Sequence, residues 1–303
     1  MGATDNQCEG STCAIEVIEQ DKLYAVKTRY INPAIQHIAG KGFTSIAYFL
    51  RVDDRLAVFD TAFRGSFFDM RKLARKELDP SKFKKTDLFL THGHQDHSGG
   101  AFALRAAYRA TVHKSAGGIS ENGEFPSKDA INELVFGGWF LDREGRQKFP
   151  LQPIPFVIDD IVQDGNPYGI NDVFITAFDG QGHSRDGMFY AVDVPQDEEN
   201  DLYLVCGDTL DFVNGGNACT VHQLKYQGDN PNALVTSVGN MIEIAREHGN
   251  LKGILTGHNY RTFNEHAQAM NSLEEGLGSA YALKKQRRIE GEPVIHTLEL
   301  LSP

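Results

Sequence analysis

The segment at residues 91–97, THGHQDH, constrains this chain more than any other part of its sequence. It carries three histidines and one aspartate directly after the apolar run at 88–90: His92, His94, Asp96 and His97. The apolar run predicts a short strand buried on both faces. Imidazole and carboxylate groups are costly to bury unpaired. So many nitrogen and oxygen donors in one place suit a metal ion such as zinc.

Three further donors follow short apolar runs or turns far downstream. His183 lies in the glycine-rich stretch DGQGHS, Asp208 ends LVCGD, and His258 ends ILTGH. Ligand sites of open α/β sheets form at the carboxyl ends of strands, so we expect these side chains to meet the early cluster at one sheet edge. Seven donors are too many for one tetrahedral ion but suit two ions that share a bridging carboxylate. The set requires no thiolate, which favours a catalytic site over a structural one.

The rest of the chain alternates between strand and helix patterns. Paired strands are predicted within 15–29 and 44–62, and single strands at 87–92, 110–114, 173–178, 188–194, 202–208 and 253–257. Helices are predicted at 66–78, 98–108, 231–248 and 265–288. This alternation predicts an α/β architecture. We treat residues 1–303 as one domain with an insertion or lid at about 115–172, partly helical around 130–140, where aromatic residues and prolines interrupt the pattern.

Taken together, the donor motifs resemble those of the metallo-β-lactamase superfamily. THGHQDH matches the HxHxDH signature, GQGHS the second histidine motif, CGD the bridging aspartate and TGH the last histidine. FDTA at 59–62 is similar to an earlier aspartate motif of that family. The resemblance covers about residues 45–258 and implies a four-layer αββα sandwich, with two facing sheets, helices outside and the site at one edge.

The resemblance also implies a division of the seven donors between two metals. The first metal is expected on His92, His94 and His183, the second on Asp96, His97 and His258, with Asp208 as the bridge. Asp60 is expected to orient the ligands from behind. The cofactors implied are two divalent ions, Zn²⁺ before Fe or Mn.

Such a site predicts hydrolysis of a small carbonyl compound: a lactam, lactone, ester or thioester. Zinc lowers the pKa of bound water to about 7, which makes hydroxide available for attack, and it polarises a carbonyl oxygen. Asp96 is the expected catalytic residue, which steers the nucleophile or shuttles a proton. The alternative is an iron-dependent oxidoreductase of the same fold that acts on a sulfur compound, because imidazole suits iron as well as zinc. A binding module without activity is a third reading.

Net charge and the lengths of the apolar runs limit the classes of partner that we expect for this chain. A net charge of -11 opposes the phosphate backbone of nucleic acids, and no apolar run approaches the roughly 18 residues that span a bilayer. We therefore expect a small-molecule substrate and neither nucleic acid nor membrane as partner. The N-terminal segment lacks the pattern of a signal peptide, which predicts a cytoplasmic protein. Cys8 and Cys13 either pair or, as the location favours, stay free thiols, whereas Cys206 is expected to be a small buried hydrophobe. His113 is expected to be structural.

Overall fold

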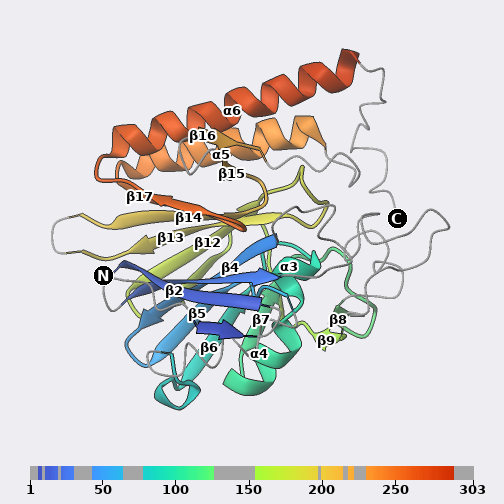
Figure 1. Ribbon diagram of the computed structural model, residues 1–303, viewed down its shortest axis with the longest axis vertical. Coiled ribbons are helices and arrows are strands. Elements are labelled where there is room, and N and C mark those ends of the chain that lie inside the picture. Colours follow the sequence, from blue (N-terminus) through green and yellow to red (C-terminus); the bar gives the residue numbers. More distant parts are fainter. Residues whose placement is uncertain are drawn as a thin grey trace.

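The computed structural model is a sandwich of two β-sheets with helices on both outer faces, as Figure 1 shows. It describes residues 6–8, 11–19, 22–30, 43–63, 78–125, 154–196, 199–213, 218–221 and 230–289. The four layers are those of the predicted αββα sandwich, and that prediction is confirmed.

The first sheet has eight strands in the order β1-β2-β3-β4-β5-β6-β7-β10. These strands are β1 (Asn6–Cys8), β2 (Ser11–Glu19), β3 (Leu23–Tyr30), β4 (Phe43–Val52), β5 (Arg55–Phe59), β6 (Lys85–Phe89), β7 (Thr111–Lys114) and β10 (Asp160–Ile161). Antiparallel pairs join β1 through β5, and parallel pairs join β5, β6, β7 and β10. The carboxyl ends of β5, β6 and β7 therefore meet at one edge.

The second sheet has six strands in the order β11-β12-β13-β14-β17-β18. These are β11 (Pro167–Ile170), β12 (Val173–Asp179), β13 (Met188–Val194), β14 (Asp201–Gly207), β17 (Leu251–Thr256) and β18 (Tyr260–Thr262). Only β14 and β17 pair in parallel, so their carboxyl ends also share an edge. Two short ribbons complete the strands: β8 (Glu124–Phe125) with β9 (Phe156–Val157), and β15 (Asp211–Val213) with β16 (Ala218–Thr220).

The inner core lies between the two sheets and is rich in aromatic rings. Phe59 and Phe89 from the first sheet pack on Tyr190 from the second, with ring centroids 5.5–5.7 Å apart. The Tyr190 hydroxyl donates to the carbonyl of Leu90 at 2.8 Å, and the Tyr48 hydroxyl donates to a carbonyl of the second sheet in the same way. These bonds satisfy buried polar groups and fix the two sheets against each other beside the shared edge.

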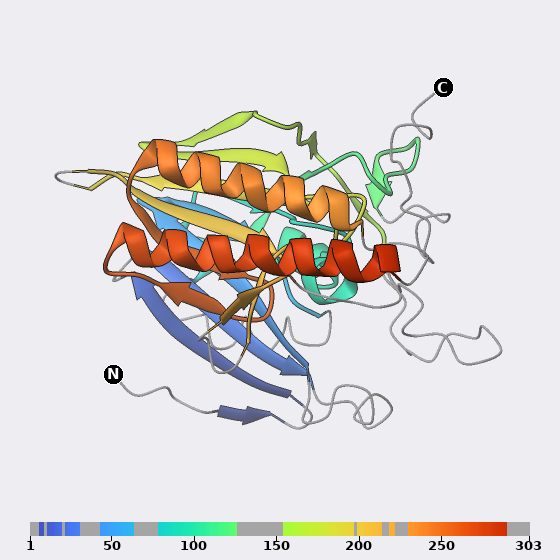
Figure 2. The ribbon, with the colours of Figure 1, turned by 90° about the horizontal axis from the view of Figure 1, so that it is seen from above.

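Helices cover the two outer faces. On the first sheet, α4 (Ala101–Tyr108) packs over an apolar layer, together with the short 3-10 helix η2 (Pro80–Lys82). On the second sheet, α5 (Pro231–His248) and α6 (His266–Ile289) lie side by side, as Figure 2 shows. A single turn, α3 (Gln95–Ser98), follows β6.

The bounds of α5 follow from its sequence. The Asn230 side chain accepts hydrogen bonds from the first turn, and Pro231 occupies the first helical position, where its missing N–H costs nothing. The helix ends at Gly249, which adopts φ 84°. Its buried face carries apolar residues at helical spacing against the second sheet: Leu234, Val238, Met241, Ile242 and Ala245.

Most predicted elements are present, with two differences. The predicted helix at 98–108 begins only at Ala101, as α4. A separate turn, α3, lies within and just after the donor motif, and Gly99 and Gly100 separate it from α4. Within the stretch predicted as an insertion or lid at about 115–172, β10 joins the first sheet and β11 joins the second, while residues 126–153 lie outside the described residues. The chain crosses from one sheet to the other between these strands, and Pro167 fits the edge position that β11 occupies.

Several predictions fall outside the described residues. They are most of the helix at 66–78, the helical part of the insertion at 130–140, and the side chains of Cys8 and Cys13. Within the described residues, no helix combines the length and the apolar character needed to cross a membrane.

Candidate metal centre

The seven predicted donors converge at the edge where strands of both sheets end. His92 and His94 follow β6, and Asp96 and His97 lie in α3. From the second sheet, the turn between β12 and β13 supplies His183, and Asp208 and His258 follow β14 and β17. Two groups of donor atoms form, each within 4.8 Å: His92, His94, His183 and Asp208, and Asp96, His97, Asp208 and His258. Asp208 belongs to both.

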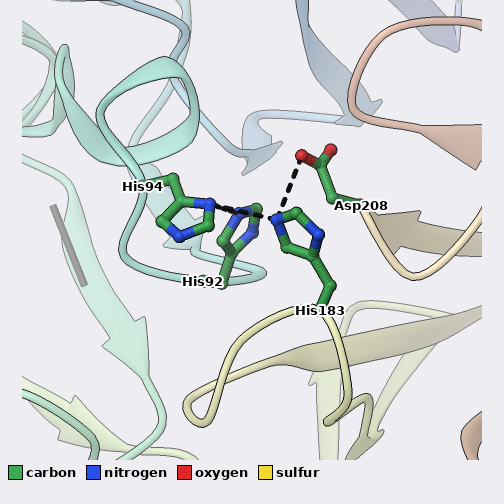
Figure 3. A group of neighbouring side chains, drawn as sticks. All are labelled: His92, His94, His183 and Asp208. Atoms are coloured by element: carbon green, nitrogen blue, oxygen red, sulfur yellow. Dashed lines mark hydrogen bonds and ion pairs between the residues drawn. The ribbon is translucent and has the colours of Figure 1, made fainter. Parts of the chain in front are cut away.

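The first group is built around three ring nitrogens, which Figure 3 shows facing one another. His94 Nδ1 lies 2.9 Å from His92 Nε2 and 3.1 Å from His183 Nε2. Asp208 Oδ2 lies 3.4 Å from His183 Nε2. Two nitrogens bound tetrahedrally to one zinc ion at about 2.05 Å each lie about 3.3 Å apart, so these separations match a shared ion.

The second group lies on the other side of Asp208. His97 Nε2 is 3.1 Å from Asp208 Oδ1 and 3.4 Å from Asp96 Oδ2. His258 Nε2 is 3.2 Å from Asp208 Oδ2 and 3.6 Å from Asp96 Oδ2. Asp208 therefore presents both carboxylate oxygens to the second group and one of them to the first, which is the arrangement of a bridging carboxylate.

A chain of hydrogen bonds sets which nitrogen of His92 carries the proton. The Thr91 hydroxyl donates to Asp60 Oδ2 at 2.8 Å and lies 3.1 Å from His92 Nδ1. Since that hydroxyl proton is used, His92 Nδ1 must be the donor to Thr91. His92 Nε2 is then left with a lone pair directed into the first group, as a metal ligand requires.

Hydrogen bonds to Nδ1 also orient the two histidines of the second group. His97 Nδ1 donates to Asp60 Oδ2 at 2.8 Å, and His258 Nδ1 donates to the carbonyl of Thr44. In both rings this bond holds a proton on Nδ1, so Nε2, which lies beside Asp208, is the nitrogen available to a metal ion once its own proton is displaced. Asp60 also accepts from the Thr91 backbone N–H at 2.8 Å. It adopts φ 58°, an uncommon backbone conformation for a residue other than glycine, and such strain gathers at functional sites.

Glycine allows the two halves of the centre to approach each other. A Cβ atom on Gly257 would overlap His97 and Asp208, and a Cβ atom on Gly207 would lie 2.5 Å from Thr91 Oγ1. Gly207 also has a positive φ of 51°. A side chain at either position would push the second sheet away from the donor motif of the first.

Burial and charge divide the histidines into two electrostatic classes. Burial, aided by neighbouring imidazoles, lowers the pKa of His92 well below its usual value, and burial also lowers the pKa of His94. Burial acts in the same direction on His258, but Asp208 and Asp96 outweigh it and raise the pKa to about 9. Carboxylates likewise raise the pKa of His97 well above its usual value against the effect of burial. In the metal-free protein His92 and His94 are thus neutral imidazoles, whereas His97 and His258 are imidazolium ions among carboxylates.

The donor set fits metal ions. Three nitrogens meet in the first group, two of them within 2.9–3.1 Å of the third, and one proton satisfies only one such contact. His97 Nε2 is fully buried and makes no hydrogen bond to the described residues, despite the carboxylates near it. A cation in each group resolves both conflicts. Imidazole and carboxylate ligands in sets of three or four are those of zinc and related divalent metals.

A comparison with protein families identifies the superfamily of this chain. Residues 40–210, more than half of the 303-residue chain, match the family model of the metallo-beta-lactamase superfamily. The chain belongs to this superfamily. Among curated proteins, no sequence matches it significantly.

Solved structures of superfamily proteins share the fold. The native FEZ-1 metallo-beta-lactamase from Legionella gormanii is similar with a TM-score of 0.60 and 14% identity, over 88% of this chain and 94% of that one. A metallo-beta-lactamase from Pontibacter korlensis has a TM-score of 0.58 and 12% identity, over 89% and 99%. FIM-1 from Pseudomonas aeruginosa, solved in a mono-zinc form, has a TM-score of 0.57 and 16% identity, over 89% and 96%.

Some residues around the superfamily motifs escape sequence reasoning. Thr91 was within the motif but had no assigned role, and Thr44 acts through a backbone carbonyl that no sequence pattern identifies. Lys114 and Asp186 form a buried ion pair beside the centre. Their only sequence signal is a charge within an otherwise apolar or glycine-rich stretch.

Two other side chains behave as expected. His113 contacts Asp87 and Asp160 and stacks on Phe89, which confirms a structural role. Cys206 is buried in the outer core of the second sheet. His222, whose place after Asp208 beyond a stretch with two glycines makes it a candidate hydrogen-bond donor to substrate, lies outside the described residues.

Proposed function

We propose that this chain is a metal-dependent hydrolase that holds two divalent ions, most simply Zn²⁺, and cleaves a small carbonyl compound. The first ion is assigned to His92, His94 and His183, the second to Asp96, His97 and His258, and the bridge to Asp208. The observation that carries the proposal is the inward direction of the ring nitrogens. The partners behind His92, His97 and His258 hold a proton on Nδ1 of each ring and direct Nε2 into the donor groups.

When bound, such ions supply Lewis acidity, which produces a nucleophile from water at neutral pH and polarises a carbonyl oxygen. The protein contributes the placement of charge and of protons. Asp96 has its pKa lowered to about 2, because His97 and His258 outweigh the effect of burial, so it is a carboxylate at neutral pH. A carboxylate at this position accepts the proton that water gives up and passes it to the leaving group.

Access to the centre is from the side of the second group. The side chains of Asp96 and His258 are 14% and 11% exposed, whereas those of His97 and Asp208 are 0% and 2% exposed. The three histidines of the first group are also buried. Asp96 and His258 are therefore the ligands of this centre that a substrate would reach first.

Lactams, lactones, esters and thioesters share the reactive group that this site would attack, a carbonyl carbon with a leaving heteroatom. The three solved structures compared above are described as metallo-beta-lactamases, which places lactams first in a substrate screen. Action on a small molecule in the cytoplasm, without nucleic acid or membrane as partner, stays a prediction from the sequence.

The proposal is tested by measuring hydrolysis of chromogenic lactams, lactones, esters and thioesters together with metal content. We expect about two zinc ions per chain, loss of activity on chelation, and recovery when Zn²⁺ is returned. Asp96→Asn should lower kcat by about 10²- to 10⁴-fold, the usual contribution of a general acid or base, with an unchanged circular dichroism spectrum. Wild-type turnover in that variant would contradict the role given to Asp96.

Metal analysis also distinguishes the proposed hydrolase from the alternative, an iron-dependent oxidoreductase. Protein purified without added metal that contains one iron ion per chain, and consumes oxygen with a sulfur compound, would overturn the hydrolase proposal and support an oxidoreductase.

A further inference from the structure

A buried ion pair lies beside the first group of donors. Lys114 ends β7, and its Nζ atom lies 2.7 Å from Asp186 Oδ2, with both side chains 0% exposed. Lys114 Nζ also donates to the carbonyl of Gly117 at 2.6 Å and lies 4.4 Å from the centre of the Phe125 ring. Apart from Lys114, the Asp186 carboxylate has no hydrogen-bond partner within the described part of the chain, so Lys114 is the charge that neutralises it.

The pair joins the two segments that carry the first group. Asp186 lies three residues after His183, in the turn between β12 and β13. A Cβ atom on Gly93 would lie 3.0 Å from Asp186 Oδ2 and 2.6 Å from Phe125, so both side chains press on the backbone between His92 and His94. The Ser115 hydroxyl adds a bond to the Asp186 carbonyl at 2.7 Å. Lys114 and Asp186 therefore connect the turn that bears His183 with the backbone of the donor motif.

Stability alone is a weak reason for this arrangement. Burial removes both charges from water, and a well-packed apolar pair of similar volume is often as stable as a buried ion pair, or more so. An ion pair differs from an apolar contact in its direction and its fixed separation. Here the ion pair joins β7 of the first sheet to the turn of the second sheet that bears His183. The imidazole nitrogens of the first group lie 2.9–3.1 Å apart.

We propose that the Lys114–Asp186 ion pair is a positioning element for the first metal alone, which holds His183 at binding distance from His92 and His94. This inference rests on the proposed function, since it assumes that the first group binds a metal. The second group has supports that do not involve this ion pair: Asp60 behind His97 and Thr44 behind His258. Loss of the pair should therefore weaken one site and leave the other intact.

The test measures Zn²⁺ affinity at each site separately, by competition with a chromophoric chelator. His258→Ala leaves only the first site complete, and His94→Ala leaves only the second. Lys114→Met is introduced into each background. We expect its Zn²⁺ affinity to fall by about 10- to 100-fold in the His258→Ala background, the usual effect of losing a residue that supports metal ligands. The change should be less than about threefold in the His94→Ala background.

Lys114→Met alone leaves a buried carboxylate without its partner, which can unfold the protein. The double variant Lys114→Met/Asp186→Leu removes both charges and keeps the volume apolar. It should fold, as judged by circular dichroism and a thermal transition, and still show the selective loss at the first site. Asp87→Asn is the matched control. Asp87 is a buried carboxylate held by Arg55, Lys85 and His113 on the same sheet, away from the donor atoms. It should change stability without selective loss of either metal.

Two results would overturn the inference. One is a double variant that folds and binds Zn²⁺ at the first site as tightly as the background. The other is an equal loss at both sites, which indicates a general structural role. Wild-type protein that binds no Zn²⁺ would instead refute the proposed function, so the two failures are distinguishable.

Discussion

The electrostatic difference between the two groups predicts that the two metals bind with different dependence on pH. In the metal-free protein His92 and His94 have lowered pKa values and are neutral near pH 7, so a metal enters the first site without displacing protons from them. His97 and His258 have raised pKa values and are charged. A metal entering the second site must displace these protons, since only a neutral imidazole is a ligand.

The pKa of His258 sets the size of this pH dependence at the second site. With a pKa of about 9, its protonated form exceeds the neutral one by about 100 to 1 at pH 7, which costs Zn²⁺ binding about 3 kcal/mol. Each displaced proton makes affinity rise about tenfold per pH unit below the pKa. His258 alone therefore gives a tenfold rise between pH 7 and 8, and the charged His97 adds to it. Affinity at the first site should change much less.

The stability of the metal-free protein depends on pH in the opposite direction to metal binding at the second site. Because the pKa of His258 is raised on folding, its charged form stabilises the metal-free protein below about pH 6.5, its ordinary value, and this contribution is lost as the pH rises through about 9. Raising the pH from 7 to 9 should therefore weaken that part of the stability of the metal-free fold while it strengthens binding of the second metal.

Titration calorimetry of Zn²⁺ in buffers with different ionisation enthalpies counts the protons released at each site. The His94→Ala protein, with only the second site complete, should release at least one proton per zinc at pH 7, and the His258→Ala protein fewer. The reasoning is refuted if the two proteins release equal numbers of protons, or if second-site affinity does not rise between pH 7 and 8.

Two substitutions around the ligands give further expectations. Asp60→Asn keeps the shape but replaces the carboxylate that accepts from Thr91 and His97, so Zn²⁺ affinity should fall by about 10- to 100-fold, and an unchanged affinity would show that these bonds do not orient the rings. Gly257→Ala places a methyl group against His97 and should abolish the second metal, with retention of two zinc ions per chain as the contrary result. Gly239→Ala, in α5 with open space around it, is the matched control and should stabilise the helix by about 0.5–1 kcal/mol.

Local sequence predicts elements where the physical signal is itself local. The α5 helix begins and ends as predicted because Asn230, Pro231 and Gly249 act within a few residues of their own positions. The strand before the donor motif is recognisable because β6 is buried on both faces. The sequence pattern did not predict the strands at 160–170. β10 and β11 are too short to show a period and form strands by pairing with β7 and β12.

The sequence by itself determined the seven donors and their order along the chain, because apolar strand ends followed by histidine or aspartate carry a recognisable signal. Only the tertiary structure decided the protonation, the charge and the spacing of these donors. The proton positions on the imidazoles depend on Asp60 after β5 and Thr44 in β4, as well as on Thr91 beside His92. The charge of each histidine depends on which carboxylates lie within a few ångströms, and the separation of the two sheets depends on contacts such as Lys114 with Asp186. Distances between segments far apart in the chain set these properties, and no local pattern encodes them.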